Sequence, residues 1–169
     1  MYNILKIPNE KLRRPTARIE KIEEQKETLT SICSAMYEVL NKVGGVGLAA
    51  NQVGIDMRLF VARIDNKPYY FLNPKILEER GKQDSMEGCL SVPNFTSKVV
   101  RPAEIELLWT TIEGEIKTER FKGFNACIVS HEMGHLEGRL FIDYLPEFKQ
   151  QKAKKKVEIW KRRQRKQSS

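Results

Sequence analysis

The residues best suited to chemistry in this chain lie in the segment SHEMGHLEG, residues 130–138. The segment contains the pattern H-E-x-x-H, in which His131 and His135 are the only two histidines of the chain. Residues four apart on a helix lie on one face, so both imidazoles can reach one divalent metal ion at about 2.0–2.1 Å. Glu132 is suited to handle a proton of a metal-bound water. A chance match on a surface helix is the alternative, but the pattern favours a metal site.

A metal site needs at least three protein ligands, and this segment supplies two. A thermolysin-like site would use a glutamate further along the chain. Glu147 is too close in sequence for that role, and Glu158 lies in a strongly basic segment that is poorly suited to line a metal cavity. The carboxylates therefore offer no good third ligand.

The three cysteines are the remaining candidates. Cys127 shares a helix face with His135, but it lies about 12 Å away along the axis, so we expect it in the core or in a pocket wall. Cys33 lies beside the apolar stripe of an earlier helix and is expected in the core. Cys89 follows Gly88, which allows close backbone approach. A cysteine in a loop is usually just buried, so on its own Cys89 is only a candidate ligand.

Length and composition limit the class of protein. A chain of 169 residues suits one domain with a core that needs no disulfides. Three cysteines without a repeated spacing argue against a disulfide framework and favour a reducing compartment. No apolar run is long enough to cross a bilayer, and the start, MYNILKIPNE, does not resemble a signal peptide. We expect the bacterial cytoplasm and no membrane partner; an organelle is the alternative if a transit peptide has been removed.

The positive charge is confined to one end of the chain. Residues 149–169 hold ten of the 30 Lys and Arg residues and one of the 22 acidic residues, so their net charge is +9 and that of the rest is −1. A solvated helix without a partner is the simpler interpretation. The functional alternative is electrostatic docking onto RNA. Trp160 could anchor such a contact or could pack back on the domain.

Hydrophobic periodicity outlines the secondary structure. Residues 10–20 are expected to be an extended entry segment. An amphipathic helix is predicted at residues 23–43, and Gly44-Gly45 ends it; its apolar residues are Leu29, Ile32, Met36, Leu40 and Val43. Strands are expected at residues 58–64, 68–74 and within 98–121, with a hairpin turn at Glu113-Gly114. A second helix, from residue 123 to about 138, carries the histidines, and residues 147–166 are Lys- and Arg-rich. The segregation of helices and antiparallel strands predicts an α+β fold.

Three segments together resemble one known family, peptide deformylase. The family motifs are G-x-G-L-A-A-x-Q, E-G-C-L-S and Q-H-E-x-D-H. The chain reads GVGLAANQ at residues 45–52, EGCLS at 87–91 and SHEMGH at 130–135. The segment LEGRLFID and the opening ILKIPNEKLRR are also similar to the family. Three motifs in the expected order are far more specific than any one of them.

The resemblance implies a single-domain α+β fold in which the H-E-x-x-H helix packs centrally among antiparallel strands. Residues 1–148 would form the catalytic domain and residues 149–169 a basic C-terminal helix. Cys89, His131 and His135 would hold one divalent metal, typically Fe²⁺, although Zn²⁺, Ni²⁺ or Co²⁺ can occupy such sites. The substrate would be the formyl-methionine end of a new polypeptide, and the products formate and a free amino terminus. Ribosomal RNA would then be the target of the basic helix.

The residue chemistry agrees with this reaction. A metal lowers the pKa of its water to about 7, so a hydroxide is available at neutral pH. Glu132 would take the proton of the water and deliver it to the leaving amine. The resemblance implies that the Gln52 side-chain amide and the Leu90 backbone N–H stabilise the oxyanion. Gln52 could instead only cap a loop. A soft thiolate ligand suits iron but exposes the site to oxidation.

The methionine side chain of the substrate requires an apolar pocket. Family position gives four candidates, although core packing explains the last three equally well: Val46, Phe124, Cys127 and Ile128. Backbone contacts from Gly47, Glu87 and Gly88 would line the groove. For Gly47, simple turn formation is the alternative explanation.

Four residues depart from the family pattern. Gly134 replaces an Asp inside the helix motif and costs about 1 kcal/mol relative to Ala. Ser130 replaces the Gln before the first histidine. Asn94 and Thr96 replace a Gly and an Arg after EGCLSVP. None of the four is a metal ligand or the base, so we expect an active enzyme that is altered in rate or substrate range.

Two other functions are compatible with parts of the sequence. A zinc metalloendopeptidase is suggested by H-E-x-x-H alone, and it would need a ligand other than Cys89. A catalytically weakened, ribosome-associated descendant is suggested by Gly134 and the basic helix. Retention of all three ligands together with Glu132 and Gln52 argues against the second. We expect the protein to be a monomer.

Overall fold

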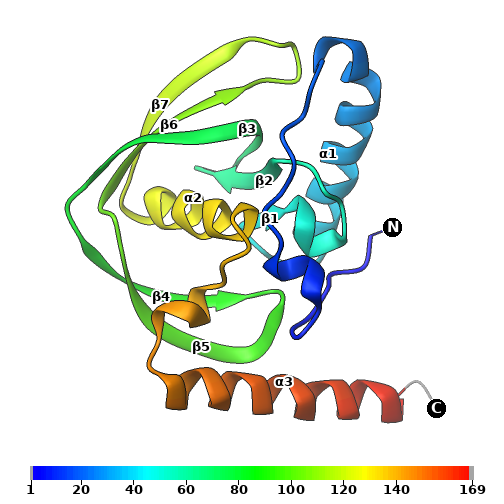
Figure 1. Cartoon of the computed structure of the whole chain (residues 1–169), viewed down its shortest axis with the longest axis vertical. Helices are drawn as coiled ribbons and strands as arrows, with labels where there is room; N and C mark the ends of the chain where they lie inside the picture. The colour runs from blue at the N-terminus through cyan, green and yellow to red at the C-terminus, as the bar shows by residue number, and fades with distance from the viewer. Residues whose placement is uncertain (1, 168–169) are drawn as a thin grey trace.

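The helix that carries the two histidines lies at the centre of the molecule (Figure 1). A computed structural model describes residues 2–167. Its three α-helices are α1 (Lys26–Lys42), α2 (Gly123–Leu136) and α3 (Glu147–Gln167). The strands are β1 (Gly47–Ala49), β2 (Leu59–Ile64), β3 (Lys67–Arg80), β4 (Gln83–Cys89), β5 (Val92–Arg101), β6 (Glu104–Thr110) and β7 (Ile116–Lys122). This is the α+β architecture that the sequence predicts.

A five-stranded antiparallel sheet separates α1 from α2. Its strand order is β1-β2-β3-β6-β7. Successive side chains of a strand point to opposite faces, and β2 uses both faces. Leu59 and Val61 pack in a buried cluster with residues of α1, whereas Phe60 and Ala62 pack in a second cluster with residues of α2. Because α2 is covered nearly all round, its sequence is apolar on most sides.

A separate hairpin, β4–β5, brings a cysteine to the central helix. Its strands are antiparallel, and Cys89 pairs with Val92, so Leu90 and Ser91 form a two-residue loop. Beyond the hairpin, the short 3-10 turn Phe141–Tyr144 leads into α3. The hairpin tip therefore lies between the centre of the molecule and its C-terminal helix.

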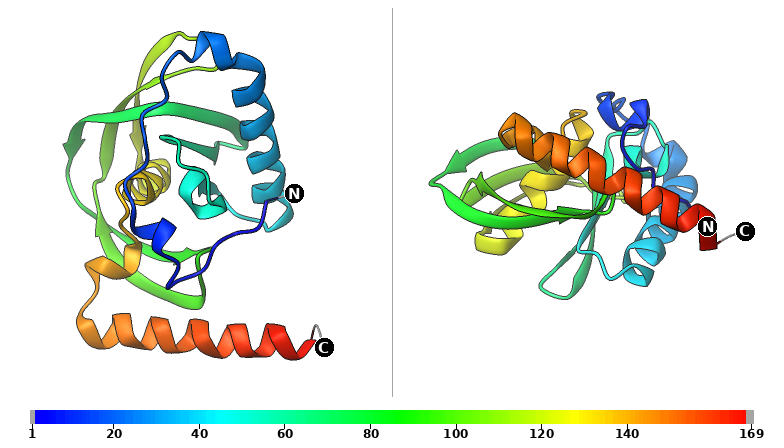
Figure 2. Two further views of the ribbon diagram at one scale, coloured as in Figure 1. Left: turned by 45° about the vertical axis from the view of Figure 1, so that its right-hand side comes forward. Right: turned by 90° about the horizontal axis from the view of Figure 1, so that it is seen from below.

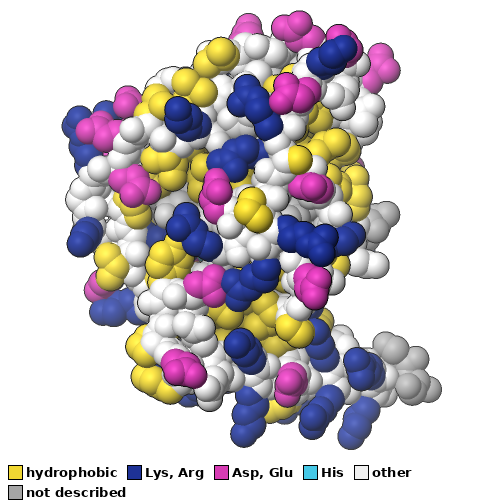
Figure 3. All heavy atoms as spheres, in the orientation of Figure 1, with side chains coloured by type: hydrophobic (Ala, Val, Ile, Leu, Met, Phe, Trp, Pro, Cys, Tyr) yellow, Lys and Arg dark blue, Asp and Glu magenta, His cyan; other side chains and the backbone are white. Residues whose placement is uncertain are grey.

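The helix α3 lies against β5 along one edge of the molecule (Figures 1 and 2). Its two buried residues, Ala153 and Val157, join a cluster with Val92 and Phe95 of β5. Many Lys and Arg side chains lie along α3 on the face that Figure 3 shows, at its lower rim. Among residues 2–167, no helix is long and apolar enough to cross a membrane.

Most predicted elements are confirmed, with shifted ends. The first predicted helix begins at Lys26, after a 3-10 turn, and its last predicted apolar residue, Val43, is 46% exposed beyond the helix end. The turn at Glu113-Gly114 joins β6 to β7, with Gly114 at φ +87°. The entry segment is not wholly extended, because residues 10–13 form a 3-10 turn.

Two strand predictions were wrong in extent. The strand predicted to end at Pro74 continues to Arg80, because a register shift between Leu72 and Lys75, with Asn73 at φ +48°, accommodates the proline. The strand β4 was missed, and Cys89 lies at its end instead of in a loop. The inward-facing residues of β4 include Ser85 and Glu87, so no apolar alternation marks it.

Candidate active site and metal centre

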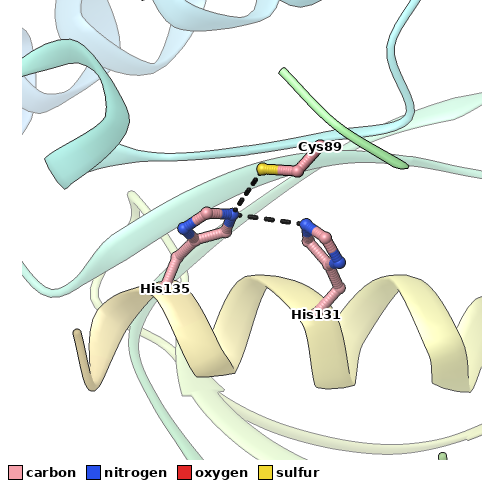
Figure 4. A group of neighbouring side chains, drawn as sticks. All are labelled: Cys89, His131 and His135. Carbon is pink, nitrogen blue, oxygen red and sulfur yellow. Dashed lines mark hydrogen bonds between the residues drawn. The ribbon is translucent and has the colours of Figure 1, made fainter. Parts of the chain in front are cut away.

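Three potential ligand atoms meet between α2 and the tip of the β4–β5 hairpin (Figure 4). His131 and His135 project from one face of α2, one turn apart. The Cys89 Sγ lies 3.3 Å from the His135 Nε2, which in turn lies 3.2 Å from the His131 Nε2. All three atoms fall within 4.8 Å of one another.

The trio fits a single divalent cation. Two nitrogens that each lie about 2.1 Å from a tetrahedral ion are roughly 3.4 Å apart, close to the observed 3.2 Å between the two Nε2 atoms. One sulfur and two imidazole nitrogens suit zinc or iron. In addition, among residues 2–167 the buried Oε2 of Glu132 has no hydrogen-bond partner in the protein. An uncompensated carboxylate oxygen beside such a cluster is expected where a water or substrate normally supplies the missing contact.

Two donors point at the cysteine sulfur. The Gln52 Nε2 lies 3.6 Å from the Cys89 Sγ, and the Ser91 N–H donates to the same atom at 3.4 Å. The Gln52 Oε1 accepts the Ala49 N–H at 2.9 Å, which fixes the orientation of the amide with its NH₂ group toward the sulfur. These contacts fix the position of the sulfur beside the two histidines.

A buried ion pair supports the first histidine from behind. Glu87 accepts two hydrogen bonds from Arg101, each 2.8 Å, and its Oε2 also lies 2.8 Å from the His131 Nδ1. Burial alone would raise the pKa of Glu87, but the hydrogen bonds from Arg101 and His131 outweigh it and lower that pKa to about 2. A fixed carboxylate on Nδ1 leaves the His131 Nε2 directed at the metal position.

The histidines and the glutamate on α2 have strongly perturbed acidity. Burial opposes charging of His131, but hydrogen bonds to Cys89 and Glu87 raise its pKa to about 10. Burial and the charge of His131 together lower the pKa of His135 well below its ordinary value. Burial raises the pKa of Glu132 to about 7, against the opposing charge of His131. A carboxyl group with a pKa near neutrality is suited to exchange protons.

A groove of about 480 Å³ opens over these groups. Every predicted site residue except His135 lines it, and His135 lies fully buried beneath. Phe124 is 65% exposed and is therefore not a core residue, whereas Ile128 also belongs to the core cluster on the sheet. The remaining predicted groove residues are Val46, Gly47, Gln52, Glu87, Gly88, Leu90 and Cys127.

The structure explains two of the four departures from the family pattern, those at Ser130 and Asn94, and gives no reason for Gly134 or Thr96. Ser130 accepts a hydrogen bond from Arg101 at 3.3 Å and so joins the support of His131. A Cβ added at Gly134 would meet only the Arg139 carbonyl oxygen, at an ordinary 3.6 Å. Asn94 adopts φ +61°, a left-handed conformation that favours Gly and that Asn tolerates. Thr96 lines the groove.

Sequence reasoning missed several residues at this site. Arg101 lies ten residues beyond the EGCLS motif, and no sequence pattern pairs it with Glu87. Ser91 is the last residue of that motif, but its contact with the cysteine sulfur was not predicted. Lys156, on the basic helix, lines the outer end of the groove, with its Nζ 5.9 Å from the centre of the Phe95 ring. Lys6 reaches the hairpin tip from the chain start and donates to the Leu90 carbonyl oxygen at 2.7 Å.

The fold and the Cys-His-His cluster beside a buried glutamate define a metal-dependent hydrolase. The model of the polypeptide deformylase family matches residues 1–151, and the chain belongs to this family. It is 37% identical over 160 residues to the peptide deformylase of Phenylobacterium zucineum, covering 91% of this chain and 93% of the relative. It is 34% identical over 163 residues to that of Xylella fastidiosa, covering 95% and 96%.

Solved structures give the same result. The peptide deformylase of Legionella pneumophila matches with a TM-score of 0.91 and 32% identity over 97% of both chains. The enzyme of Ehrlichia chaffeensis, solved in complex with actinonin, matches with a TM-score of 0.89 and 31% identity over 96% of this chain and 98% of that one. The predicted fold and family are thereby confirmed.

Proposed function

We propose that the chain hydrolyses the formyl group from the N-terminal formyl-methionine of newly made polypeptides, with Cys89, His131 and His135 as ligands of one divalent metal. The observation that carries this proposal is the approach of the Cys89 sulfur to within 3.3 Å of His135, at the base of the groove. A divalent cation bound there supplies a water of lowered pKa and a positive charge beside the formyl oxygen. Fe²⁺ is the proposed ion, since a soft thiolate suits it; Zn²⁺, Ni²⁺ and Co²⁺ would fit the same ligands.

Glu132 moves the proton in this reaction. Its carboxylate takes a proton from the attacking water and returns it to the leaving amine nitrogen. Burial raises the pKa of Glu132 above its ordinary value, which favours the protonated form that delivers the proton to the amine. Its partnerless Oε2 is free to make the necessary contact.

Two donors stabilise the oxyanion that forms on the formyl group. The Gln52 Nε2 is turned toward Cys89 by the bond between its Oε1 and the Ala49 N–H. The Leu90 backbone N–H lies next to Cys89 in the same groove wall. The Gln52 amide is held before the substrate arrives, so it needs little reorganisation.

The apolar part of the groove receives the methionine side chain. Cys127 and Ile128 are buried in the groove wall, while Phe124 and Val46 flank it as exposed residues. The backbone at residues 47, 87 and 88 lines the path of the peptide.

A formate-release assay tests this function. Purified protein loaded with Fe²⁺ should release formate from formyl-Met peptides, and a chelator should abolish the release. Glu132→Gln should lower kcat by roughly 100-fold or more while it retains the metal. Cleavage of an unformylated protein substrate, without formate release, would favour the metalloendopeptidase instead.

We further propose that residues 1–148 act as the catalytic domain and that the basic segment, residues 149–169, docks on ribosomal RNA. The segment's net charge of +9 and the exposed Lys and Arg residues of α3 support this proposal. The reaction would then take place in the bacterial cytoplasm, by a monomer at the exit of nascent chains. Deletion of residues 149–169 should weaken ribosome binding; binding that is unchanged and independent of salt would contradict the proposal.

A further inference from the structure

We infer that Lys6 is a positioning residue for the hairpin tip that carries Cys89 and Leu90, and that α3 holds Lys6 in place. This inference rests on the proposed function, in which Cys89 is a ligand and Leu90 an oxyanion donor. The inference connects α3 to the proposed reacting groups by a chain of contacts that passes through Lys6.

The hairpin tip lacks the backbone geometry that usually stabilises a two-residue loop. Such loops favour types I′ and II′, which place one or both central residues at positive φ. The β2–β3 hairpin follows this rule, with Asp65 at φ +49° and Asn66 at φ +63°. Neither Leu90 nor Ser91 adopts a positive φ. The β4–β5 loop lacks this local preference, so contacts from outside the hairpin matter more for its position.

The N-terminal strap, residues 5–7, supplies those contacts. The Lys6 Nζ donates to the Leu90 carbonyl oxygen at 2.7 Å, and the Ile7 N–H donates to the Ser91 carbonyl oxygen at 3.1 Å. The Leu5 N–H donates to the Gln52 carbonyl oxygen at 2.7 Å. One strap thus ties together the two segments that carry the proposed oxyanion donors.

Lys6 is also linked to the Cys89 sulfur through one peptide unit. The peptide unit between Leu90 and Ser91 accepts from Lys6 through its carbonyl oxygen and donates to the Cys89 Sγ through its N–H, at 3.4 Å. Hydrogen bonds in such a chain polarise one another, so a cationic donor on the oxygen strengthens the N–H contact to sulfur. Burial lowers the pKa of Lys6, and the charge of Cys89 acts in the opposite direction.

The far half of α3 holds the strap. The Lys6 Nζ lies 5.6 Å from the centre of the Trp160 ring, a cation–π distance. The Lys161 Nζ donates to the Ile7 carbonyl oxygen at 2.7 Å. The contact with Lys6 places Trp160 on the side of α3 that faces the domain. A displacement of this part of α3 would release the strap and, through it, the hairpin tip.

Steady-state kinetics of Lys6→Met test the positioning role. We expect kcat to fall by roughly 10-fold, with an almost unchanged KM, metal content and melting temperature. Lys6→Arg should recover most of kcat, since it restores a cationic donor. Lys82→Met, a change at an exposed lysine away from the strap, should behave as wild type.

A spectroscopic readout separates positioning from simple destabilisation. In the Co²⁺-loaded protein, Lys6→Met should shift the charge-transfer absorption between the cysteine sulfur and the metal, whereas Lys82→Met should not. A loss of activity that tracks only a fall in melting temperature or in metal content, without a spectral shift or rescue by Arg, would overturn the inference.

A double-mutant cycle tests the link to α3. Trp160→Leu should lower kcat by roughly 3-fold, and the same change in the Lys6→Met background should have little further effect, because both act through one contact. Fully additive effects would overturn the link. Absence of formate release from the wild-type protein would overturn the proposed function itself, whereas an active wild type with unchanged kcat in Lys6→Met would overturn this inference alone.

Discussion

Gly47 packs against the side chain of Glu132 so closely that residue 47 has no room for a side chain. A Cβ at this position would lie 2.7 Å from the Glu132 Cδ and 2.8 Å from its Cγ. Gly47 does not adopt a positive φ, so the requirement for glycine is one of space and not of backbone conformation. The first motif of the sequence therefore shapes the environment of the proposed base.

Gly47→Ala should displace the Glu132 carboxylate. We expect kcat to fall by roughly 100-fold, because a shift of about 1 Å in a reacting group has this order of effect. The proposed metal ligands are other residues of α2 and β4, so metal content should stay at the wild-type value. Wild-type kcat in this variant would contradict the assigned role of Glu132.

Gly134→Ala is a second glycine-to-alanine change near the site, on the helix that carries Glu132. It should stabilise the fold and leave the reaction unaffected. A methyl group there meets only the Arg139 carbonyl oxygen, at 3.6 Å. Because Ala is the better helix former, the free energy of unfolding should rise by about 1 kcal/mol, with kcat unchanged. Chemical denaturation measures this effect, and a loss of stability would mean that Gly134 has a structural role not visible in its surroundings.

Arg101→Met should destabilise the fold, because it leaves the Glu87 carboxylate buried without its main partner. Removal of one member of a buried pair costs about 3–5 kcal/mol. Lys98→Met breaks an exposed pair with Asp84 on the same hairpin and should cost less than about 1 kcal/mol. Similar losses of unfolding free energy in the two variants would contradict this account of the buried pair.

The same pair predicts sensitivity to acid. The pKa of Glu87 falls from 4.5 to about 2 in the folded protein, since hydrogen bonds from Arg101 and His131 outweigh burial. A lowered pKa contributes stability that is complete above the ordinary value and is lost as the pH falls toward the folded value. Acid unfolding of the metal-free wild type should therefore steepen between pH 4.5 and pH 2, and Glu87→Gln should remove that component.

The candidate ligands and the candidate base could be named from the sequence because short spacings on a helix and three ordered motifs mark them locally. The prediction that Cys89 completes the set depended on the family resemblance, since helix geometry only excluded Cys127. The fold class followed from segregated helices and strands. These features are encoded within runs of a few residues.

The supporting contacts could not be predicted in the same way. Arg101 and Lys6 come from segments that are distant in sequence, and both contact the site. Nothing in the sequence distinguishes either residue from the other lysines and arginines of the chain. The strand β4 was missed because its inward side chains include Ser85 and Glu87, which are buried by an ion pair and hydrogen bonds instead of apolar packing. Polar contacts between distant segments leave no repeating pattern in the local sequence, so they cannot be predicted from it.

The decisive experiment measures formate release and metal content together on the wild type and on Cys89→Ala. The iron-loaded wild type should release formate from a formyl-Met peptide, and a chelator should stop the release. Cys89→Ala should lose both metal and activity, while Cys127→Ala should keep its metal. A Cys89→Ala protein that binds metal and releases formate at the wild-type rate would contradict the proposed role of Cys89 as a ligand.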